Sequence, residues 1–389
     1  MNLILSVDAI VPPLSGIGRY TWELAQRYVA EPRFGPVRFY LHGRWVSDPA
    51  LLLTPSPAGR AGRYPVKPPA WLRHGILRRA CRGSVFHGPN YFLPACADIG
   101  VATVHDLSVF RFPEMHPAAR VMQFEQEFAR SLDRAVHLIT DSEAIRQEVI
   151  EFCAWPAGRI TAIPLGVGPS FVPLTSAVTS RALAMRGLVP DAYALCVATL
   201  EPRKRINRLL AAYGRLPRGL LERYPLVLAG SPGWHDEAIR GAIDEAQREG
   251  WMRYLGFVAD AELPALYAGA RAFLFPSIYE GFGLPVLEAM ACGVPVLTSD
   301  RGAMKELAGN AALLVEPDDT DALLRGIERV LTDEEWRSEA RSQGLSIASG
   351  HTWERCVART FEVCRFADDV GIGTRDIGAT RQVTAIRAD

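Results

Sequence analysis

Two glutamates flank a glycine-rich turn in the stretch IYEGFGLPVLEAMACGVPV, residues 278–296. Glu280 precedes the turn and Glu288 follows it, while Pro285 between them is suited to the first turn of a helix. A carboxylate accepts hydrogen bonds from hydroxyl groups, and the main-chain N–H groups of an open turn donate to oxygens. The pattern therefore suits a polyhydroxylated ligand, with Glu288 placed to accept from two hydroxyls of a ribose. Alternatively, both acids only stabilise a helix N-terminus, for about 1 kcal/mol or less each.

A basic pair stands in the stretch VATLEPRKRINRLLAAY, where an apolar strand-like run gives way to a helix-like one. Arg203 offers a planar fork of donors and Lys204 a mobile point charge, a combination that suits a diphosphate. Cations in the first turn of a helix oppose its dipole, so a binding role is favoured over a merely solvated surface.

A glycine loop, PPLSGIGRYTWEL, follows the first apolar run and opens a helix. Gly16 and Gly18 allow close approach of the backbone to a phosphate, and the helix start supplies N–H donors. The dinucleotide-binding fingerprint would require a third glycine where Thr21 stands, and the P-loop lysine is missing. The alternative is that the glycines only form a tight turn.

His105 ends another apolar run, in VATVHDLSVF. At the carboxyl end of a parallel strand a histidine can donate to a substrate hydroxyl or stabilise developing charge, but it can equally cap a loop. His87 is a weaker candidate of the same kind, and Asp106 could be a turn former.

Two further stretches have alternatives. Asp319 and Asp321, in VEPDDTDALL, could hold a divalent metal, but an N-cap for the following helix is favoured because no further acidic ligand is nearby. We therefore expect neither a metal site nor a cofactor.

The basic stretch WLRHGILRRACRG, residues 71–83, could lie on an anionic membrane surface. An ordinary amphipathic helix with a solvated basic face is favoured, because the stretch is short and its apolar side narrow.

The composition of the chain limits the classes of protein to which it can belong. The chain has 389 residues, 49% of them hydrophobic, and 43 basic residues balance 43 acidic ones, so nothing global indicates nucleic acid as a partner. Seven scattered cysteines without a C-x-x-C pair argue against a disulfide framework or structural zinc and fit a reducing cytoplasm. The N-terminal run lacks the features of a signal peptide, and no apolar run reaches the ~18 residues of a membrane span.

Continuous apolar strands alternate with helix-like stretches in both halves of the chain, which predicts parallel sheets covered on both faces. We expect an α/β protein of two Rossmann-like, doubly wound domains facing a cleft, joined near residues 163–178. The predicted domains span 1–170 and 171–350, and residues 367–389 have no strong period and are expected to form a tail. Eleven strands are expected, in NLILSVDA, VRFYLHG, SVFHG, GVATVHD, AVHLITDS, AYALCVATL, YPLVLAG, MRYLGFV, RAFLFPS, VPVLTS and AALLVEP.

Several motifs together resemble those of the GT-B fold glycosyltransferases, most of all the large retaining family called family four. The resemblance runs in order from residue 1 to about 365, and its most specific part is the pair of glutamates separated by seven residues. The forms LEPRK and GIGRYT are most similar to bacterial mannosyltransferases that build lipopolysaccharide O-antigen or capsule from GDP-mannose. The motifs are SGIGRYTWEL, VHDLSVFRFPEMHP, TDSEAIRQEV, ATLEPRKRINRLL, AGSPGWHDEAI and EGFGLPVLEAMACGVPV.

The resemblance implies a role for each site residue. Glu280, with the N–H groups that follow it, would hold the donor sugar, Glu288 the ribose, and the basic pair the diphosphate. The loop at Gly16 and Gly18 would approach the phosphates and the acceptor, His105 would touch the sugar near its 6-hydroxyl, and Val258 would lie near the base. A final helix over residues 351–366 would cross back to the first domain. The implied donor-binding residues are Gly16, Gly18, Arg203, Lys204, Val258, Glu280, Gly281, Phe282, Gly283, Leu284 and Glu288.

One departure from the family pattern concerns Arg205 and Ile206, which replace the more usual asparagine-containing continuation and leave the helix register there open. The implied activity is metal-free transfer of a hexose, with retention, from a nucleotide diphosphate to a glycan or lipid-linked glycan acceptor. It would take place in the cytoplasm, with a peripheral membrane location as one option. The alternatives are a UDP-sugar or other donor, a nucleotide-sugar epimerase on the same scaffold, or a sugar-binding protein with a hinged cleft.

Overall fold

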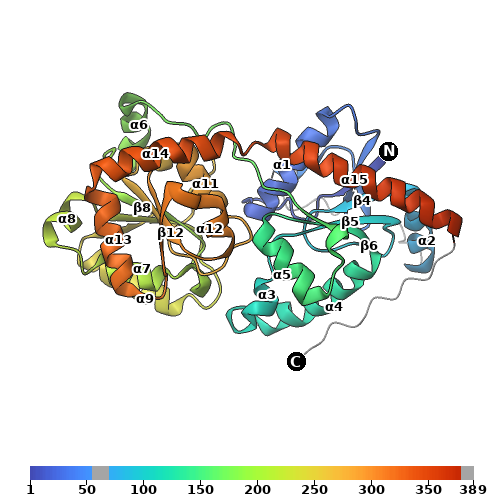
Figure 1. Ribbon diagram of the computed structural model, residues 1–389, viewed down its shortest axis with the longest axis horizontal. Helices are drawn as coiled ribbons and strands as arrows, with labels where there is room; N and C mark the ends of the chain where they lie inside the picture. The colour runs from blue at the N-terminus through green and yellow to red at the C-terminus, as the bar shows by residue number, and fades with distance from the viewer. Residues whose placement is uncertain (55–69, 378–389) are drawn as a thin grey trace, which may run out of the picture. The chain divides into compact units, whose positions relative to one another are not determined.

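The protein folds into two compact units in the computed structural model, which describes residues 1–54 and 70–377 (Figure 1). Unit 1 contains Met1–Leu107, Met122–Pro164 and the chain from Trp353 onward. Unit 2 contains Ser108–Val121 and Leu165–Thr352. Each unit is built around its own, mostly parallel sheet, and the predicted pair of Rossmann-like domains is confirmed.

The sheet of unit 1 has seven strands in the order β3-β2-β1-β4-β5-β6-β7, and every neighbouring pair except β2–β3 is parallel. Every residue of β4, β5 and β6 is buried, as expected for central strands covered on both faces. The strands are β1 (Asn2–Ser6), β2 (Val37–Leu41), β3 (Arg44–Val46), β4 (Ser84–Gly88), β5 (Ile99–Val104), β6 (Ala135–Thr140) and β7 (Ile160–Ala162).

One long helix, α15, packs on β4, β5, β6 and α1, so the last helix that the structure describes belongs to unit 1 (Figure 1). It runs from Trp353 to Ile377, past residue 366, where the tail was expected to begin. Ala367 is fully buried and Gly371 lies against Ile99, so packing on the sheet continues the helix where its sequence period is weak. The other helices here are α1 (Gly16–Ala30), η1 (Pro49–Leu52), α2 (Ala70–Cys81), α5 (Glu143–Cys153), η3 (Ala157–Arg159) and, from Met122 onward, α4 (Ala118–Arg134), whose first four residues belong to unit 2.

The sheet of unit 2 is entirely parallel, in the order β10-β9-β8-β11-β12-β13. On one side of the β8–β11 pair the chain continues to β9 and β10, and on the other side it continues to β12 and β13. Open α/β sheets bind ligands at such a point, where the strand order reverses. The strands are β8 (Ala194–Val197), β9 (Leu226–Ala229), β10 (Met252–Tyr254), β11 (Ala272–Phe275), β12 (Val296–Ser299) and β13 (Ala312–Val315).

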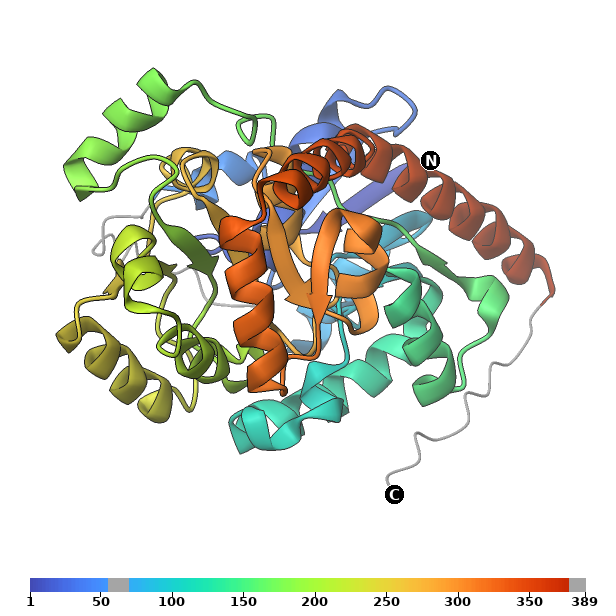
Figure 2. The same ribbon diagram turned by 60° about the vertical axis from the view of Figure 1, so that its left-hand side comes forward.

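Helices of unit 2 cover this sheet, among them α13, the orange helix in front of the orange strands in Figure 2, which contacts β11, β12 and β13. The short helices of this unit are η2 (Pro113–Met115), η4 (Ala184–Arg186), η5 (Pro202–Lys204) and η6 (Gly309–Ala311). The α-helices are α3 (Ser108–Arg111), α6 (Ser176–Leu183), α7 (Ile206–Tyr213), α8 (Arg218–Arg223), α9 (Glu237–Arg248), α10 (Leu263–Ala268), α11 (Leu284–Ala291), α12 (Gly302–Ala308), α13 (Thr320–Thr332) and α14 (Glu334–Ser349).

The helix register after the basic pair is fixed by Arg205, which takes a left-handed conformation with φ 53° and ends η5. Helix α7 then begins at Ile206. A left-handed conformation is strained for a residue with a Cβ atom, and the Arg205 side chain is held by Asp318 at 2.8 Å. The sequence departure at this position therefore leaves α7 in place.

All seven cysteines are buried and none forms a disulfide. Among residues 1–54 and 70–377, no helix has the length and apolar character needed to span a bilayer.

Candidate functional site

The loops after β8 and β11 lie side by side at one edge of the unit 2 sheet because these two strands pair in parallel, Ala272 with Ala194 and Phe273 with Leu195. Main-chain contacts join the loops: the Ile278 N–H donates to the Arg203 carbonyl at 2.9 Å. The turn that carries Glu280 and the short helix that carries the basic pair are therefore joined at one edge of the sheet.

Arg203, Lys204 and Glu280 meet at this edge. The Lys204 ammonium pairs with Glu280 Oε1, and Arg203 Nη1 lies 3.5 Å from Glu280 Oε2. Arg203 is oriented further by Glu201, at 2.9 Å from its Nε, and by the Tyr279 carbonyl, at 3.0 Å from Nη1. The sequence predicted these three residues as binding groups, and the structure brings their charges into one cluster.

Electrostatics keep Glu280 ionised. Burial alone would raise the pKa of its carboxyl group, but the charges of Lys204 and Arg203 and a hydrogen bond from Ser277 hold this pKa below its ordinary value. Burial, together with the positive charge of Arg203, lowers the pKa of Lys204. The result is a largely desolvated cluster in which Arg203 and Lys204 balance Glu201 and Glu280, and the two cations are the groups of this cluster that can donate charge-assisted hydrogen bonds to an anion.

Ser277 is a site residue that sequence reasoning missed. Its hydroxyl, fully buried, donates to Glu280 Oε1 at 2.6 Å and lies 3.3 Å from the Arg203 carbonyl. Serine after a buried strand is common, so its type carried no specific signal. Ser277 orients the Glu280 carboxylate because the loop after β11 returns toward η5, and this return is visible only in the structure.

The glycine-rich turn opens α11. Gly283 is the N-cap with φ 106°, and a Cβ there would lie 2.2 Å from Met304 Cε, so only glycine fits. The N–H groups of Phe282, Gly283 and Leu284 donate to no acceptor within the part of the chain that the structure describes. The sequence predicts donors to ligand oxygens at residues 281–284, and three of these four N–H groups lie at the positive end of the helix dipole without an acceptor in the described chain.

Two other predicted donor residues are buried. Glu288 lies on α11 and is 4% exposed. Val258, which follows β10, is also 4% exposed, whereas its neighbour Phe257 is 51% exposed. A ligand can therefore reach the Phe257 ring or the main chain of this segment more readily than the Val258 side chain, which packs inward.

In unit 1, α1 begins at the predicted glycine loop. The Ser15 hydroxyl caps the helix by accepting from the Gly18 N–H at 3.2 Å. The N–H groups of Gly16 and Ile17 have no acceptor in the described chain. The loop thus has the donors that an anion needs, together with the dipole of a fifteen-residue helix.

Gly16 and Gly18 of this loop differ in whether the packing around them leaves room for a Cβ atom. A Cβ on Gly18 would lie 2.9 Å from the Ala9 carbonyl oxygen, whereas a Cβ on Gly16 would meet nothing within 4 Å. We expect Gly18→Ala to lower the free energy of unfolding by about 1–3 kcal/mol through overpacking. Gly16→Ala should change it by less than about 0.5 kcal/mol. Urea unfolding of the two variants checks this, and equal losses would contradict the assigned packing.

His105 follows β5 and is buried in a hydrogen-bonded pair with Asp141. Its Nδ1 lies 2.7 Å from Asp141 Oδ2 and its Nε2 lies 2.8 Å from the Pro89 carbonyl oxygen. The Tyr20 ring, from α1, packs edge-on against the imidazole with centroids 5.0 Å apart. Because both ring nitrogens face acceptors, the imidazole is charged and donates from both positions.

The pKa of His105 agrees with this assignment. Burial alone would lower it, but the charge and hydrogen bond of Asp141 raise it above the ordinary value. The ring has no free nitrogen, so a hydrogen bond from His105 to a sugar hydroxyl requires the Pro89 carbonyl to give way. Asp141 was not predicted; it belongs to the TDS run after β6, and only the sheet order β5-β6 places it beside His105.

His87 is a core residue. Its Nδ1 lies 2.8 Å from the Tyr28 hydroxyl and its Nε2 lies 2.9 Å from the Thr103 hydroxyl. Burial, with a smaller contribution from the charge on His105, lowers the pKa of His87 to about 3. The imidazole is therefore neutral and structural.

The acidic run before α13 forms a helix cap, as favoured. Asp319 Oδ1 accepts from the N–H groups of Asp321 and Ala322 at 3.0 and 2.9 Å. Asp321 pairs with Arg215 at 2.7 Å. Within residues 1–54 and 70–377, no group of three or more His, Cys, Asp or Glu residues is arranged to hold a metal ion.

The edge of unit 2 that carries the cluster lies in a segment that matches a known family. Residues 188–346 match the family of glycosyl transferases group 1. The chain is 38% identical over 375 residues to O-antigen chain mannosyltransferase B of Escherichia coli, covering 92% of this chain and 98% of that protein. It is 33% identical over 277 residues to the serotype-specific mannosyltransferase WbdA of Escherichia coli, covering 69% of this chain but 34% of that protein.

Solved structures share the fold. WaaG, a glycosyltransferase involved in lipopolysaccharide biosynthesis, superimposes with a TM-score of 0.68 at 17% identity, covering 96% of this chain and 100% of that one. Anabaena Alr3699/HepE, in complex with UDP and glucose, superimposes with a TM-score of 0.69 at 18% identity, covering 93% and 98%. The fold is that of the GT-B glycosyltransferases, and the chain belongs to the glycosyl transferases group 1 family.

Proposed function

We propose that this glycosyltransferase is a retaining enzyme that moves mannose from GDP-mannose onto a saccharide or lipid-linked saccharide in the biosynthesis of a surface polysaccharide such as O-antigen. The observation that carries the proposal is the cluster of Arg203, Lys204 and Glu280 at the edge of the unit 2 sheet. The similarity to E. coli O-antigen chain mannosyltransferase B supports mannose as the sugar and O-antigen as the product class.

Each group of the proposed donor site binds a different part of the donor. Arg203 and Lys204 neutralise the diphosphate, while Glu280 accepts from sugar hydroxyls. Glu288 binds the ribose, and the base lies against the segment of Phe257 and Val258. The N–H groups of residues 282–284 donate to the sugar, and those of Gly16 and Ile17 in unit 1 donate to an anionic group of a substrate.

The reaction requires stabilisation of negative charge more than it requires a nucleophile. The bond between the anomeric carbon and the diphosphate oxygen breaks, and an acceptor hydroxyl forms the new bond on the same face. The hydroxyl proton passes to the departing phosphate oxygen. Fixed cations aimed at that oxygen lower the barrier because they need no reorganisation. No covalent sugar–enzyme intermediate is proposed.

His105 has an electrostatic role in this proposal. Its imidazolium, held by Asp141 and the Pro89 carbonyl, is a fixed positive charge at the end of β5. Such a charge stabilises a developing anion without transferring a proton.

We expect catalysis without a divalent metal. The guanidinium and ammonium groups of the cluster supply the charge that a metal would otherwise supply. Activity should be unchanged by EDTA, as measured by GDP release in the presence of acceptor. Complete loss in EDTA, restored by Mn²⁺, would contradict this prediction and return Asp319 and Asp321 to consideration.

A thermal-shift screen against GDP, UDP and ADP tests the donor. A ligand that binds only the native state raises the melting temperature by an amount set by its affinity. GDP should give the largest shift; a larger shift with UDP would move the proposal to the UDP-sugar alternative.

An acceptor assay separates the remaining alternatives. A nucleotide-sugar epimerase converts the donor without acceptor, and a binding protein releases no nucleotide at all. Release of GDP that depends on acceptor excludes both. We further propose a cytoplasmic location, which the seven buried cysteines, none of them in a disulfide, support.

A further inference from the structure

The sequence motif that contains His105 continues into unit 2. His105 belongs to unit 1, whereas the segment Ser108–Val121 packs with unit 2. This segment contains α3, η2 and the first turn of α4. Two side chains of the segment contact loops at the carboxyl edge of the unit 2 sheet, where the proposed donor site lies.

Phe112 makes the first of these contacts, with the loop after β11. Its ring lies edge-on against the Tyr279 ring, with centroids 5.4 Å apart and the two planes at 63°. This is one of the arrangements that pairs of aromatic rings prefer. Both residues are half-buried, so the pair is partly shielded from water.

The main chain of Phe112 is held on both sides. Its N–H donates to the Ser108 carbonyl at 2.9 Å, and its carbonyl accepts from the Met115 N–H at 2.9 Å. Pro113 follows directly, opens η2, and restricts the backbone of the residue before it. The Phe112 ring therefore projects from an ordered main chain and can act as a fixed support for Tyr279.

Tyr279 links this contact to the charged cluster. Its carbonyl accepts from Arg203 Nη1 at 3.0 Å, and Glu280 is the next residue of the chain. The ring and the carbonyl of Tyr279 are attached to the same Cα atom. A shift of the ring would therefore also move the carbonyl that orients Arg203 and the residue that binds the sugar hydroxyls.

Arg120 makes the second contact of the segment. Its guanidinium lies over the Trp234 ring, 5.2 Å from the ring centroid, which is within the range of a cation–π contact. Trp234 is in the loop after β9 and Tyr279 in the loop after β11, and β8 lies between these two strands in the sheet. The segment is thus anchored on both sides of the strand whose loop carries the basic pair.

We propose that Phe112 is a positioning residue of the donor site, acting through the Tyr279 ring on the turn that carries Glu280. The Phe112 side chain has no polar atom to offer a sugar or a phosphate, so its effect passes through Tyr279. The inference rests on the proposed function of this turn in sugar binding. It does not depend on which sugar or which base the donor carries.

Hydrogen exchange of the full chain tests the support of the turn directly. Phe112→Leu keeps an apolar side chain of similar size but removes the ring. We expect the amides of residues 277–284 to exchange about two- to ten-fold faster in this variant, as the loss of one aromatic pair implies, at a melting temperature close to that of the wild type. No substrate is present, so this result stands even if the enzyme does not turn over GDP-mannose.

Kinetics with GDP-mannose distinguish positioning from a loss of folded protein. In Phe112→Leu the KM for the donor should rise and kcat should fall, and together they should lower kcat/KM on the order of ten-fold, because misplaced binding groups are costly. A smaller folded fraction would lower kcat alone. Phe112→Tyr keeps the ring and should restore both constants. Failure of the wild type to use GDP-mannose would contradict the proposed donor and leave the exchange result to decide the role of Phe112.

A double-mutant cycle tests whether Phe112 acts through Tyr279. Tyr279→Leu should reproduce the kinetic change of Phe112→Leu. The double variant should be no worse than Tyr279→Leu alone, because residues that act as a unit are not additive. Losses that multiply in the double variant would show independent effects and overturn the proposal.

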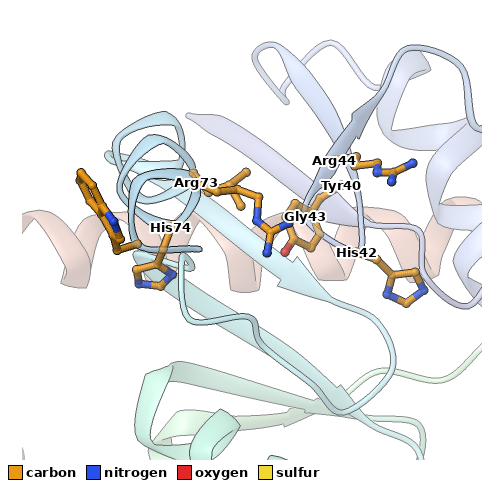
Figure 3. A pocket seen from close by; sticks show the side chains of 8 residues that line it. Tyr40, His42, Gly43, Arg44, Arg73 and His74 are labelled. Carbon is orange, nitrogen blue, oxygen red and sulfur yellow. The ribbon is translucent and has the colours of Figure 1, made fainter. Parts of the chain in front are cut away.

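A ring pair in unit 1 supplies the matched control. It lies on the β2–β3 hairpin, beside an open groove between this hairpin and α2 (Figure 3). The Trp45 ring is edge-on to the Tyr40 ring, with centroids 6.0 Å apart and the planes at 76°. Trp45→Leu removes a ring contact of the same kind from the other unit, and it should change neither the exchange of residues 277–284 nor the kinetics.

The opposite wall of this groove is α2, with Arg73 and His74 facing it in Figure 3. On this helix Trp71 is 74% exposed and Ile76 57% exposed, while Cys81 at its C-terminal end is fully buried. The favoured sequence interpretation, an ordinary amphipathic helix, would turn the apolar side chains toward the domain core, and it is wrong. Trp45, which has a ring partner, is therefore a better match for Phe112 than the exposed Trp71.

Two results of the exchange experiment would overturn the proposal. The first is an unchanged exchange rate of residues 277–284 in Phe112→Leu, which would mean that the ring does not support the turn. The second is an equal acceleration in Trp45→Leu, which would mean that the effect is a general loosening of the protein.

Discussion

Replacing Lys204 with alanine should lower kcat by about 10²–10³-fold, the usual cost of removing one fixed donor from a site where negative charge develops. Lys204 pairs with Glu280 in a desolvated cluster, and its removal leaves Arg203 as the one cation beside that carboxylate. The loss should appear in kcat rather than in KM for the donor, because charge on the leaving diphosphate grows in the transition state. Steady-state kinetics of GDP release measure it.

Two variants make this test specific. Lys305→Ala removes an exposed lysine of the same unit, also paired with an aspartate, Asp300 at 2.8 Å, and should leave kcat unchanged. Lys204→Arg keeps the charge and should retain more activity than Lys204→Ala. Near-normal turnover of Lys204→Ala, in a protein that still unfolds at the wild-type temperature, would remove Lys204 from the site.

Replacing Asp141 with asparagine should lower the free energy of unfolding by about 3–5 kcal/mol, because it leaves the buried His105 without its counter-charge. The two side chains are both buried, and their contact is 2.7 Å long. Asparagine has nearly the shape of aspartate, so the change tests the charge and not the packing. Glu143→Gln, which alters the exposed partner of Arg146 nearby, should cost less than about 1 kcal/mol.

The effect of Asp141→Asn should depend on pH. The folded-state pKa of His105 is raised, so its contribution to stability is complete below the unfolded-state value of about 6.5 and declines as the pH rises through the folded-state pKa. The difference between wild type and Asp141→Asn should therefore be largest in mild acid and smaller in alkali. Urea unfolding across this range measures it, and a difference that grows with pH would mean that the imidazole is neutral in the native protein.

The sheets were predictable from the sequence because their central strands are continuous apolar runs. All eleven expected strands are present. Strands β3 and β7 were not predicted, because each has three residues at a sheet edge and therefore shows no run of buried positions. The end of α15 was also missed, because contact with the sheet, rather than a strong period of its own, holds residues beyond 366 in a helix.

The candidate site was predictable where strand ends carry unusual side chains. The basic pair follows β8 and Glu280 precedes the glycine turn after β11, and these residues meet because the two strands are neighbours in the sheet. Ser277 and Asp141 were missed because their types are ordinary after a strand; their roles depend on which loops the sheet order brings together. The exposure of Trp71 and Ile76 on α2 could not be predicted, because the sequence does not show which face of a helix is covered.

The most direct test of the proposed activity is incubation of the purified protein with GDP-mannose and a mannose-terminated saccharide, followed by NMR of the product. The donor is α-linked, so a retaining enzyme should release one GDP for each new α-mannosyl linkage, read from the one-bond C1–H1 coupling. A β-linked product would contradict retention. Consumption of a UDP-sugar with no turnover of GDP-mannose would contradict the donor.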